Sequence, residues 1–486
     1  MKQMKTLWSI LVGYCVVLVL WGCNGQPQQR ESQDTPQEAP PSKTRPFITK
    51  WKSNGEEDIQ IPIIGTYTLT WYNEATPNER HTEQVTVEID DNTRIDVERV
   101  KPYAFMPPTE GVYVVEAGPE GVEGMYMTFY GSQRIYAPKL LSVVQFGDVV
   151  WKRLEYAFCD CEYMQFAEGI DTPDLSQCTS LKGMFSGCTA FNHPLEHWDV
   201  SHVTNMSNML SGCHAFNQSL EKWDVSHVSD MNSLFCNCWS FNQPLEGWNV
   251  RQVTDMKQAF FGCKVFNQPL AQWDVRQVTN LHNTFSHCSA FNQPLERWNV
   301  SNVTDMACLF KECMLFNQPL NSWDVSRVTN MAMMFENCKN FNQPLDAWNV
   351  GKVKGMSSMF SGCASFNQSL EAWDVSQVTS MWRMFSGCSL FNQPLNQWDV
   401  SKVETMGEMF KGCTSFNQSL DAWNISSVNK AHKDGIGGIF DGCPAGELPF
   451  VAEWKAQGVS PRSRRVVRLA PQHEGYKPYA AAGDNT

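Results

Sequence analysis

The chain has 486 residues, of which 42% are hydrophobic and 18% are charged, so it can bury a large core and is long enough for more than one domain. Its formal net charge of -13 argues against nucleic acid as a partner, because proteins that bind nucleic acids present basic surfaces.

Residues 1–22 have the pattern of a lipoprotein signal peptide. Two lysines precede an apolar run over residues 7–21, which is short and close to the terminus for a transmembrane helix. The run ends in Leu-Trp-Gly-Cys, which resembles a bacterial lipobox, where a signal peptidase cuts before a cysteine that carries diacylglycerol. We therefore expect a lipid anchor at Cys23. A plain cleaved signal peptide and an uncut anchor are the alternatives.

Two different segments follow the expected anchor. Residues 23–46 are rich in Gln, Pro, Ser and Glu and have few large apolar side chains, so we expect a disordered tether. Residues 47–139 contain short runs that alternate polar and apolar residues between Gly, Pro and Asn, which predicts strands at residues 66–71, 85–89, 112–115 and 125–130. This segment is expected to be a small, β-sandwich-like module.

From residue 140 to residue 444 the sequence is a tandem repeat with a period of 25 residues. Each unit reads approximately W-[DN]-V-S-x-V-T-x-M-x-x-M-F-x-G-C-x-x-F-N-Q-[PS]-L. With degenerate units at both ends the pattern predicts a solenoid of about twelve stacked coils. One cysteine recurs in every regular unit and forms what we call the cysteine column: Cys188, Cys213, Cys238, Cys263, Cys288, Cys313, Cys338, Cys363, Cys388 and Cys413.

The spacing within a unit predicts a strand and a short helix. Val203, Met206, Leu210 and Cys213 are spaced so that they would share one face of a helix. Residues 195–200 are the candidate strand, with alternate side chains turned inward. A strand and a helix in each unit predict an α/β, leucine-rich-repeat-like solenoid, and an all-β right-handed helix is the alternative.

Residues that are identical in every unit are interpreted as scaffold. The cysteine column is expected to consist of buried thiols that act as small apolar packers, with disulfides or metal binding as alternatives. A tryptophan column from Trp198 to Trp423 is expected in the core, with a sugar-stacking stripe as the alternative. An asparagine column from Asn192 to Asn417 is expected to form a structural amide ladder, with calcium coordination as the alternative.

Binding residues are expected where the units differ. Two stripes along the stack suit recognition of an extended protein or glycan, although solvated faces of a solenoid have the same pattern. The acidic stripe lies two residues before the tryptophans and includes Glu196, Glu221, Glu246, Glu296, Asp346 and Glu371. The valine-flanked stripe lies between the two valines of each unit and includes His202, His227, Arg327, Lys352 and Lys402.

The motifs of common enzymes are missing from the sequence. It contains no phosphate-binding glycine loop, no G-x-S-x-G elbow and no H-E-x-x-H pair, and its histidines are scattered. We therefore expect a protein that is not an enzyme and that needs no cofactor or metal.

The repeat resembles a known family. Its units, seen for example in residues 200–220 and 323–345, resemble those of the BspA-like leucine-rich-repeat surface proteins, which are abundant in Bacteroidetes and in mycoplasma lipoproteins. The resemblance implies a lipid-anchored protein of the bacterial cell envelope, at the outer membrane and exposed on the surface, which binds host matrix, other bacteria or glycans. It supplies no catalytic residues. A structural or self-associating envelope protein on the periplasmic side is the alternative.

Residues 445–486 leave the repeat pattern. They contain a basic cluster of Arg462, Arg464, Arg465 and Arg468 in an otherwise acidic chain. We expect a solvated tail, with docking onto the acidic stripe as the alternative.

Overall fold

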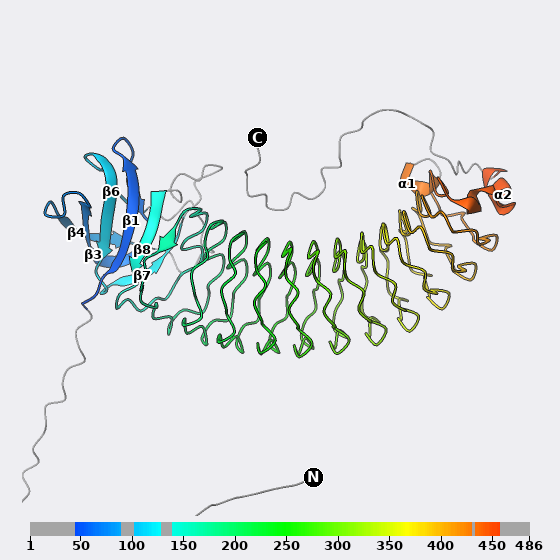
Figure 1. Cartoon of the computed structure of the whole chain (residues 1–486), viewed down its shortest axis with the longest axis horizontal. Coiled ribbons are helices and arrows are strands. Elements are labelled where there is room, and N and C mark those ends of the chain that lie inside the picture. The colour runs from blue at the N-terminus through cyan, green and yellow to red at the C-terminus, as the bar shows by residue number, and fades with distance from the viewer. Residues whose placement is uncertain (1–43, 89–101, 128–138, 430–432, 457–486) are drawn as a thin grey trace, which may run out of the picture. The chain divides into compact units, whose positions relative to one another are not determined.

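The computed structural model describes residues 44–88, 102–127, 139–429 and 433–456. In this part of the chain a β-rich module is followed by coils that lie side by side in a stack (Figure 1). None of the described helices has the length and apolar character needed to cross a membrane. The expected signal peptide, Cys23 and the basic cluster at residues 462–468 lie outside the described residues.

The module is built on one large sheet that contains three of the four expected strands in whole or in large part. The expected strands at residues 66–71 and 112–115 lie within β3 (Ile63–Asn73) and β6 (Glu110–Ala117), and the expected strand at residues 85–89 overlaps the end of β4 (His81–Val87). Of the expected strand at residues 125–130, Met125 ends β7 (Val122–Met125), residues 126 and 127 are not in a strand, and residues 128–130 lie outside the described residues. The large sheet has the order β4-β3-β6-β1-β8-β9, with β7 paired to β3, and β2 and β5 form a second, small sheet. The strands are β1 (Phe47–Asn54), β2 (Ile59–Ile61), β3 (Ile63–Asn73), β4 (His81–Val87), β5 (Tyr103–Phe105), β6 (Glu110–Ala117), β7 (Val122–Met125), β8 (Leu140–Gln145) and β9 (Gln165–Phe166).

The module and the first coils share a sheet and a core. Strand β8 pairs antiparallel with β1 and parallel with β9, so the expected junction at residues 139 and 140 lies inside continuous structure. Phe146, just after β8, stacks on Phe47 with ring centroids 6.1 Å apart and meets Trp198 of the repeat edge-on at 5.6 Å. The module therefore covers the open end of the coil stack, which a repeat array requires.

The end of the expected tether is bound to this junction. The backbone N–H groups of Thr44 and Arg45 donate to a carboxylate oxygen of Asp148 at 3.1 and 3.0 Å. The Arg45 guanidinium also pairs with Asp148 at 2.8 Å and with Asp171 at 3.1 Å. The prediction of a disordered tether is therefore wrong for residues 44–46, because three polar groups hold them in place.

The coils between residues 167 and 429 contain no helix, so the prediction of a short helix in each unit is wrong. All residues from 167 to 429 are described, and none of them is helical. Asn208 and Gly212 have left-handed φ angles of 57° and 77°, and a right-handed helix cannot pass through such residues. Alternate N–H groups instead donate to the next coil, as Asn208 does to the carbonyl of Asn232 at 2.8 Å. The N–H groups between them close turns, as Met209 does to Met206 at 3.1 Å.

The prediction of a strand at residues 195–200 is also wrong, because none of these residues is in a strand. The parallel pairing between regular coils is limited to one residue in each, as between Asn205 and Asp230. The repeat region is thus a solenoid of linked turns and does not have the predicted α/β coil. The burial pattern nevertheless agrees with the sequence analysis, because Val203, Met206 and Leu210 are all fully buried.

The last coil is covered by residues that were expected to be a solvated tail. Helix α1 (Lys433–Ile436) lies in the last coil, and the 3-10 helix η2 (Pro444–Glu447) and helix α2 (Phe450–Ala456) follow it. Trp454 of α2 is buried and stacks on Trp423 with ring centroids 6.4 Å apart. The prediction of a solvated tail is therefore wrong for residues 445–456, which cap the apolar end of the array.

Candidate binding surface

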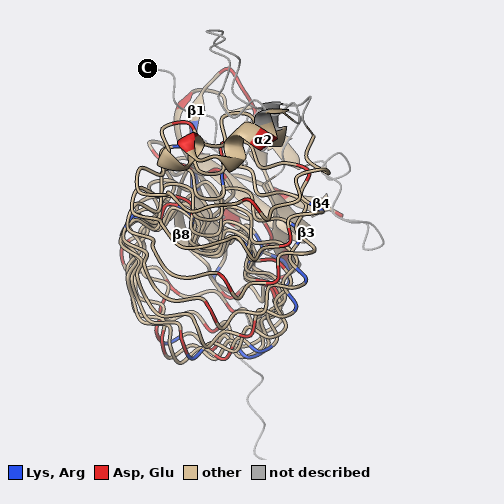
Figure 2. Ribbon diagram, turned by 90° about the vertical axis from the view of Figure 1, so that its right-hand side faces the viewer, with Lys and Arg blue, Asp and Glu red and all other residues tan. Residues whose placement is uncertain are grey.

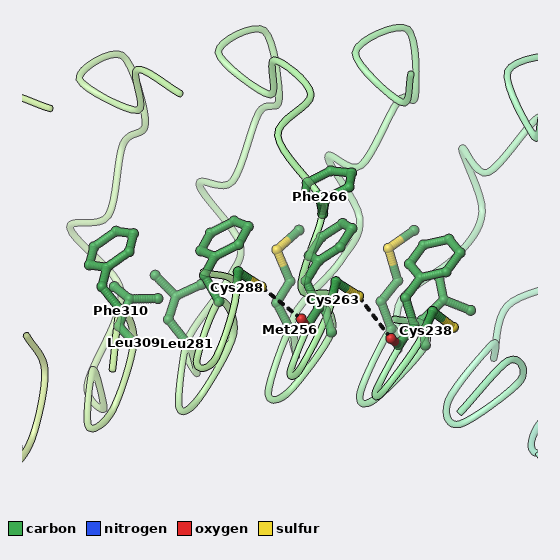
Figure 3. Close-up of a cluster of buried hydrophobic side chains, with 14 of the residues drawn as sticks. Cys238, Met256, Cys263, Phe266, Leu281, Cys288, Leu309 and Phe310 are labelled. Atoms are coloured by element: carbon green, nitrogen blue, oxygen red, sulfur yellow. Dashed lines mark hydrogen bonds between the residues drawn. The ribbon is translucent and has the colours of Figure 1, made fainter. Parts of the chain in front are cut away.

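The cysteine column is buried scaffold, as the sequence predicted. Each of its thiols is fully buried and free. The thiol of Cys288 donates to the carbonyl oxygen of Phe260 at 3.0 Å, and that of Cys263 donates to Phe235 at 3.0 Å (Figure 3). Burial raises the pKa of both thiols above their usual range. The column therefore links neighbouring coils as protonated thiols, a bonding role that the sequence did not indicate.

The tryptophan and asparagine columns also hold the coils together. The Trp298 indole is buried and its Nε1–H donates to the carbonyl of Leu270 at 2.9 Å, so the core interpretation is confirmed. The Oδ1 atom of Asn267 accepts from the backbone N–H of Asn292 at 2.9 Å and from Nε2 of Gln293 at 3.2 Å. This bonding, repeated from coil to coil, is the predicted amide ladder. These three columns are therefore bonded inward or to the next coil and form the scaffold of the array.

The acidic stripe lies at the surface, with every member exposed or half-buried. Its carboxylates have few basic partners. Glu196 lies 3.5 Å from Lys222 and 3.3 Å from His197. Such exposed pairs contribute little to stability, so these groups are available to solvent.

A second line of carboxylates runs beside the acidic stripe and was missed as a surface feature. It lies one residue after each tryptophan and includes Asp199, Asp224 and Asp399, all exposed. Each accepts the N–H of the residue two positions later, as Asp199 does from Ser201 at 3.1 Å. Hydrogen bonds from Ser201 lower the pKa of Asp199, so it stays charged at neutral pH. The signal was present in the sequence as the recurring W-[DN] pair.

The valine-flanked stripe is exposed too, and its members bond along the stack. Arg327 donates to the side-chain oxygen of Asn302 at 2.7 Å, and Lys402 donates to that of Gln377 at 3.0 Å. Acidic and basic residues together are spread over the coils and are not gathered on a single basic face (Figure 2). The structure therefore places both expected stripes at the surface and brings neither into a defined site.

The turn after each cysteine exposes apolar side chains that the expected sites did not include. We call the two positions after each cysteine of the column the post-cysteine surface. In four of the ten regular units both positions hold small polar residues or alanine, and in four others at least one position holds a large apolar residue. The exposed members, with the exposed fraction of each residue, are Trp239 (40%), Val265 (46%), Met314 (38%), Leu315 (50%) and Leu390 (55%). Variation between units at these positions was the sequence signal that could have found them.

The partly exposed Trp239 ring contacts side chains from both neighbouring coils. The His214 ring stacks parallel to it with centroids 3.6 Å apart and planes inclined by 5°. The ammonium group of Lys264 lies 4.0 Å from the centroid of the Trp239 ring, which is cation–π geometry. His214, Trp239 and Lys264 occupy the same position in three successive units, so the coil stacking builds this arrangement directly.

The coils next to this patch differ from the consensus in their backbone as well. The residue before the cysteine has a positive φ angle and is Gly in six of the ten regular units. The exceptions, with φ near 60°, are Asn237 and, in three successive units, His287, Glu312 and Asn337. Left-handed conformations cost non-glycine residues about 1–2 kcal/mol each. Asn337 donates to Glu312 at 2.6 Å, and Lys311 pairs with Glu336 at 2.8 Å. The middle of the array is thus the part that departs most from the scaffold pattern.

Among the described residues, no group of three or more His, Cys, Asp or Glu side chains is arranged to hold a metal ion. Ser286 is fully buried, and its hydroxyl is without a hydrogen-bond partner.

The repeat region matches a known family model three times in tandem. The model is described as "Mycoplasma protein of unknown function, DUF285", and the matches lie at residues 152–272, 254–367 and 334–434. Together they span residues 152–434, which is more than half of the chain. The chain belongs to the DUF285 family. Comparisons of this DUF285 protein with curated proteins and with solved structures each found no match.

Proposed function

We propose that this protein is a non-enzymatic lipoprotein of the bacterial cell envelope whose solenoid binds a protein or glycan through positions that vary between coils. One observation carries the proposal: the cysteine, tryptophan and asparagine columns are buried or bonded to the next coil, while large apolar residues are exposed on the post-cysteine surface, where the units differ. Exposed apolar residues grouped on one surface are typical of interaction sites.

The anchor and the location are part of the proposal. The lipobox-like motif ending at Cys23 supports a lipid anchor, and the resemblance to BspA-like leucine-rich-repeat proteins supports an outer-membrane protein displayed on the cell surface. The DUF285 matches support a mycoplasma-type repeat lipoprotein more broadly. The acidic and valine-flanked stripes remain candidate binding residues beside the post-cysteine surface.

A structural, self-associating envelope protein is the second candidate. The exposed apolar residues of the post-cysteine surface favour self-association, because a second copy of the protein would cover them. Sedimentation velocity of the purified ectodomain, residues 24–486, separates the two candidates. A binding protein is expected to sediment as a monomer at low and high salt, whereas oligomers that persist in high salt would support self-association.

A further inference from the structure

The post-cysteine surface differs in charge from the rest of the chain. The chain contains 51 Asp and Glu residues against 38 Lys and Arg. None of these acidic residues falls between a cysteine of the column and the leucine seven positions later in the units from Cys188 to Leu420. The charged residues found there are basic, and Lys264 and Lys339 are both exposed. An acidic protein thus carries a strip that is basic and apolar.

The apolar and basic residues of this strip lie close together on successive coils. Lys264 covers Trp239 and is followed directly by Val265. The next unit has the small residues Ser289 and Ala290 at these positions, and the unit after it has Met314 and Leu315. Lys339 follows on the next coil. The exposed apolar residues Val265, Met314 and Leu315 therefore lie on coils between Lys264 at one end and Lys339 at the other.

The geometry at Trp239 argues against a glycan as the ligand. Sugars stack on exposed aromatic faces, but the Trp239 ring is stacked against His214 and covered by the ammonium group of Lys264. The remaining exposed side chains, Val265, Met314 and Leu315, are aliphatic and pack best against apolar side chains. These features favour a polypeptide.

We propose that the post-cysteine surface from Trp239 to Lys339 binds an extended polypeptide segment that carries apolar side chains flanked by Asp or Glu. The apolar side chains lie on Val265, Met314 and Leu315, and the carboxylates pair with Lys264 and Lys339. The acidic stripe and the carboxylates next to the tryptophans repel the same segment, so charge fixes which surface it contacts. This inference rests on the proposed binding function and names the partner's chemistry.

Three labelled 12-residue peptides test the proposal against the full-length protein in lipid nanodiscs. All three carry Leu at every third position, with Glu, Ser or Lys at the positions between. Fluorescence anisotropy is expected to show the Glu peptide binding roughly tenfold or more tightly than the Lys peptide at low salt. The difference in affinity between the Glu and Lys peptides is expected to become smaller in 0.5 M salt, because salt screens exposed charges.

Matched variants locate the binding. The double variant Lys264→Glu with Lys339→Glu is expected to weaken binding of the Glu peptide and to strengthen binding of the Lys peptide. The variant Leu315→Ser is expected to weaken binding of all three peptides. The matched control Lys52→Glu with Lys354→Glu exchanges two exposed lysines outside the post-cysteine surface and both stripes, and it is expected to leave Glu-peptide binding unchanged. The variant Glu221→Gln with Glu371→Gln reports separately on the acidic stripe. The substituted side chains are exposed, so the urea midpoint is expected to stay the same and to show that each variant is folded.

Several results would overturn the assignment. The Lys peptide could bind best and depend on Glu221 and Glu371, in which case the solenoid binds proteins through the acidic stripe and the proposed function stands without this inference. Failure of all three peptides to bind, or Glu-peptide binding that the lysine exchange leaves unchanged, would also reject it. Binding of a neutral oligosaccharide such as cellohexaose that Trp239→Ala abolishes would assign the surface to glycans instead.

Discussion

At the scale of single residues, the array is held together by side chains that bond to the neighbouring coil. Each unit contributes a thiol, an indole N–H and an amide, as shown by Cys288, Trp298 and Asn267. Because all three donate to or accept from backbone groups, they satisfy buried polar atoms that turns leave unpaired. The consensus thus encodes hydrogen bonds between coils as well as apolar packing.

The buried thiols make the fold sensitive to alkali. Burial holds the pKa of Cys263 and Cys288 above the ordinary value of 9.0. Below that pH the thiols are protonated in both folded and unfolded chains. Above it the unfolded chain loses protons that the folded chain keeps, so each thiol lowers the free energy of unfolding by about 1.4 kcal/mol per pH unit.

Urea unfolding at pH 7, 8.5, 9.5 and 10 measures this dependence. The midpoint is expected to be nearly constant up to about pH 8.5 and to fall steeply beyond it. The variant Cys263→Ala with Cys288→Ala is the control. Above pH 8.5 its free energy of unfolding is expected to fall less steeply with pH, because unfolding releases about two protons fewer. If the free energy of unfolding fell with pH equally steeply in the variant, the thiols of the cysteine column would not be the cause of the alkali sensitivity.

The amide ladder gives a second prediction at this scale. Asn267→Leu removes the side-chain acceptor of the Asn292 N–H and is expected to cost about 1–2 kcal/mol, because that N–H loses its partner. Gln293 loses one of its two bonds and keeps the one to the backbone carbonyl of residue 267. Asn267→Asp keeps an oxygen in the same place and is expected to cost less. Thermal unfolding of both variants checks the order, and equal losses would contradict the ladder.

At the scale of elements, the sequence predicted burial correctly and backbone conformation incorrectly. The spacing of Val203, Met206 and Leu210 is the same for one face of a helix and for linked turns that point side chains inward. The difference lies in where the N–H groups donate, and for Asn208 that is the next coil, which local spacing does not reveal. Gly212 adopts a left-handed conformation, which belongs to one of these turns.

Glycines in the left-handed position are expected to differ in their tolerance of alanine. In Gly387→Ala the new Cβ would have its nearest contact at 3.6 Å, so we expect only the conformational cost of about 1–2 kcal/mol. In Gly362→Ala the Cβ would lie 2.1 Å from Oδ1 of Asn337, which must move and disturb its bond to Glu312. Calorimetry is expected to show the larger loss for Gly362→Ala, and the reverse order would contradict this description of the turn.

At the scale of the whole molecule, the array has no uncovered end among the described residues, because the β module closes one end and α2 closes the other. The second closure could not be predicted from the sequence, since Phe450 and Trp454 fall outside the 25-residue period. The post-cysteine surface could have been found from variation between units, whereas the contacts of Trp239 with His214 and Lys264 depend on coil stacking.

The C-terminal cap is expected to be essential for a soluble array. Trp454→Ala removes a buried ring from Trp423 and Phe440 and is expected to cost about 3–5 kcal/mol locally. Hydrogen exchange is expected to rise in the last coils and to stay unchanged in the central ones. The control is Glu453→Ala, which alters an exposed residue of the same helix. If Glu453→Ala raised hydrogen exchange in the last coils as much as Trp454→Ala does, α2 would not be a specific cap.

The central claim, that the solenoid is a recognition surface displayed outside the cell, is tested most directly by proteinase treatment of intact cells. An antibody against the repeats reports digestion, and a periplasmic protein serves as the leakage control. Our account predicts that the solenoid is digested while the control survives. A solenoid that resists until the outer membrane is opened would contradict surface display and would leave the periplasmic scaffold as the function.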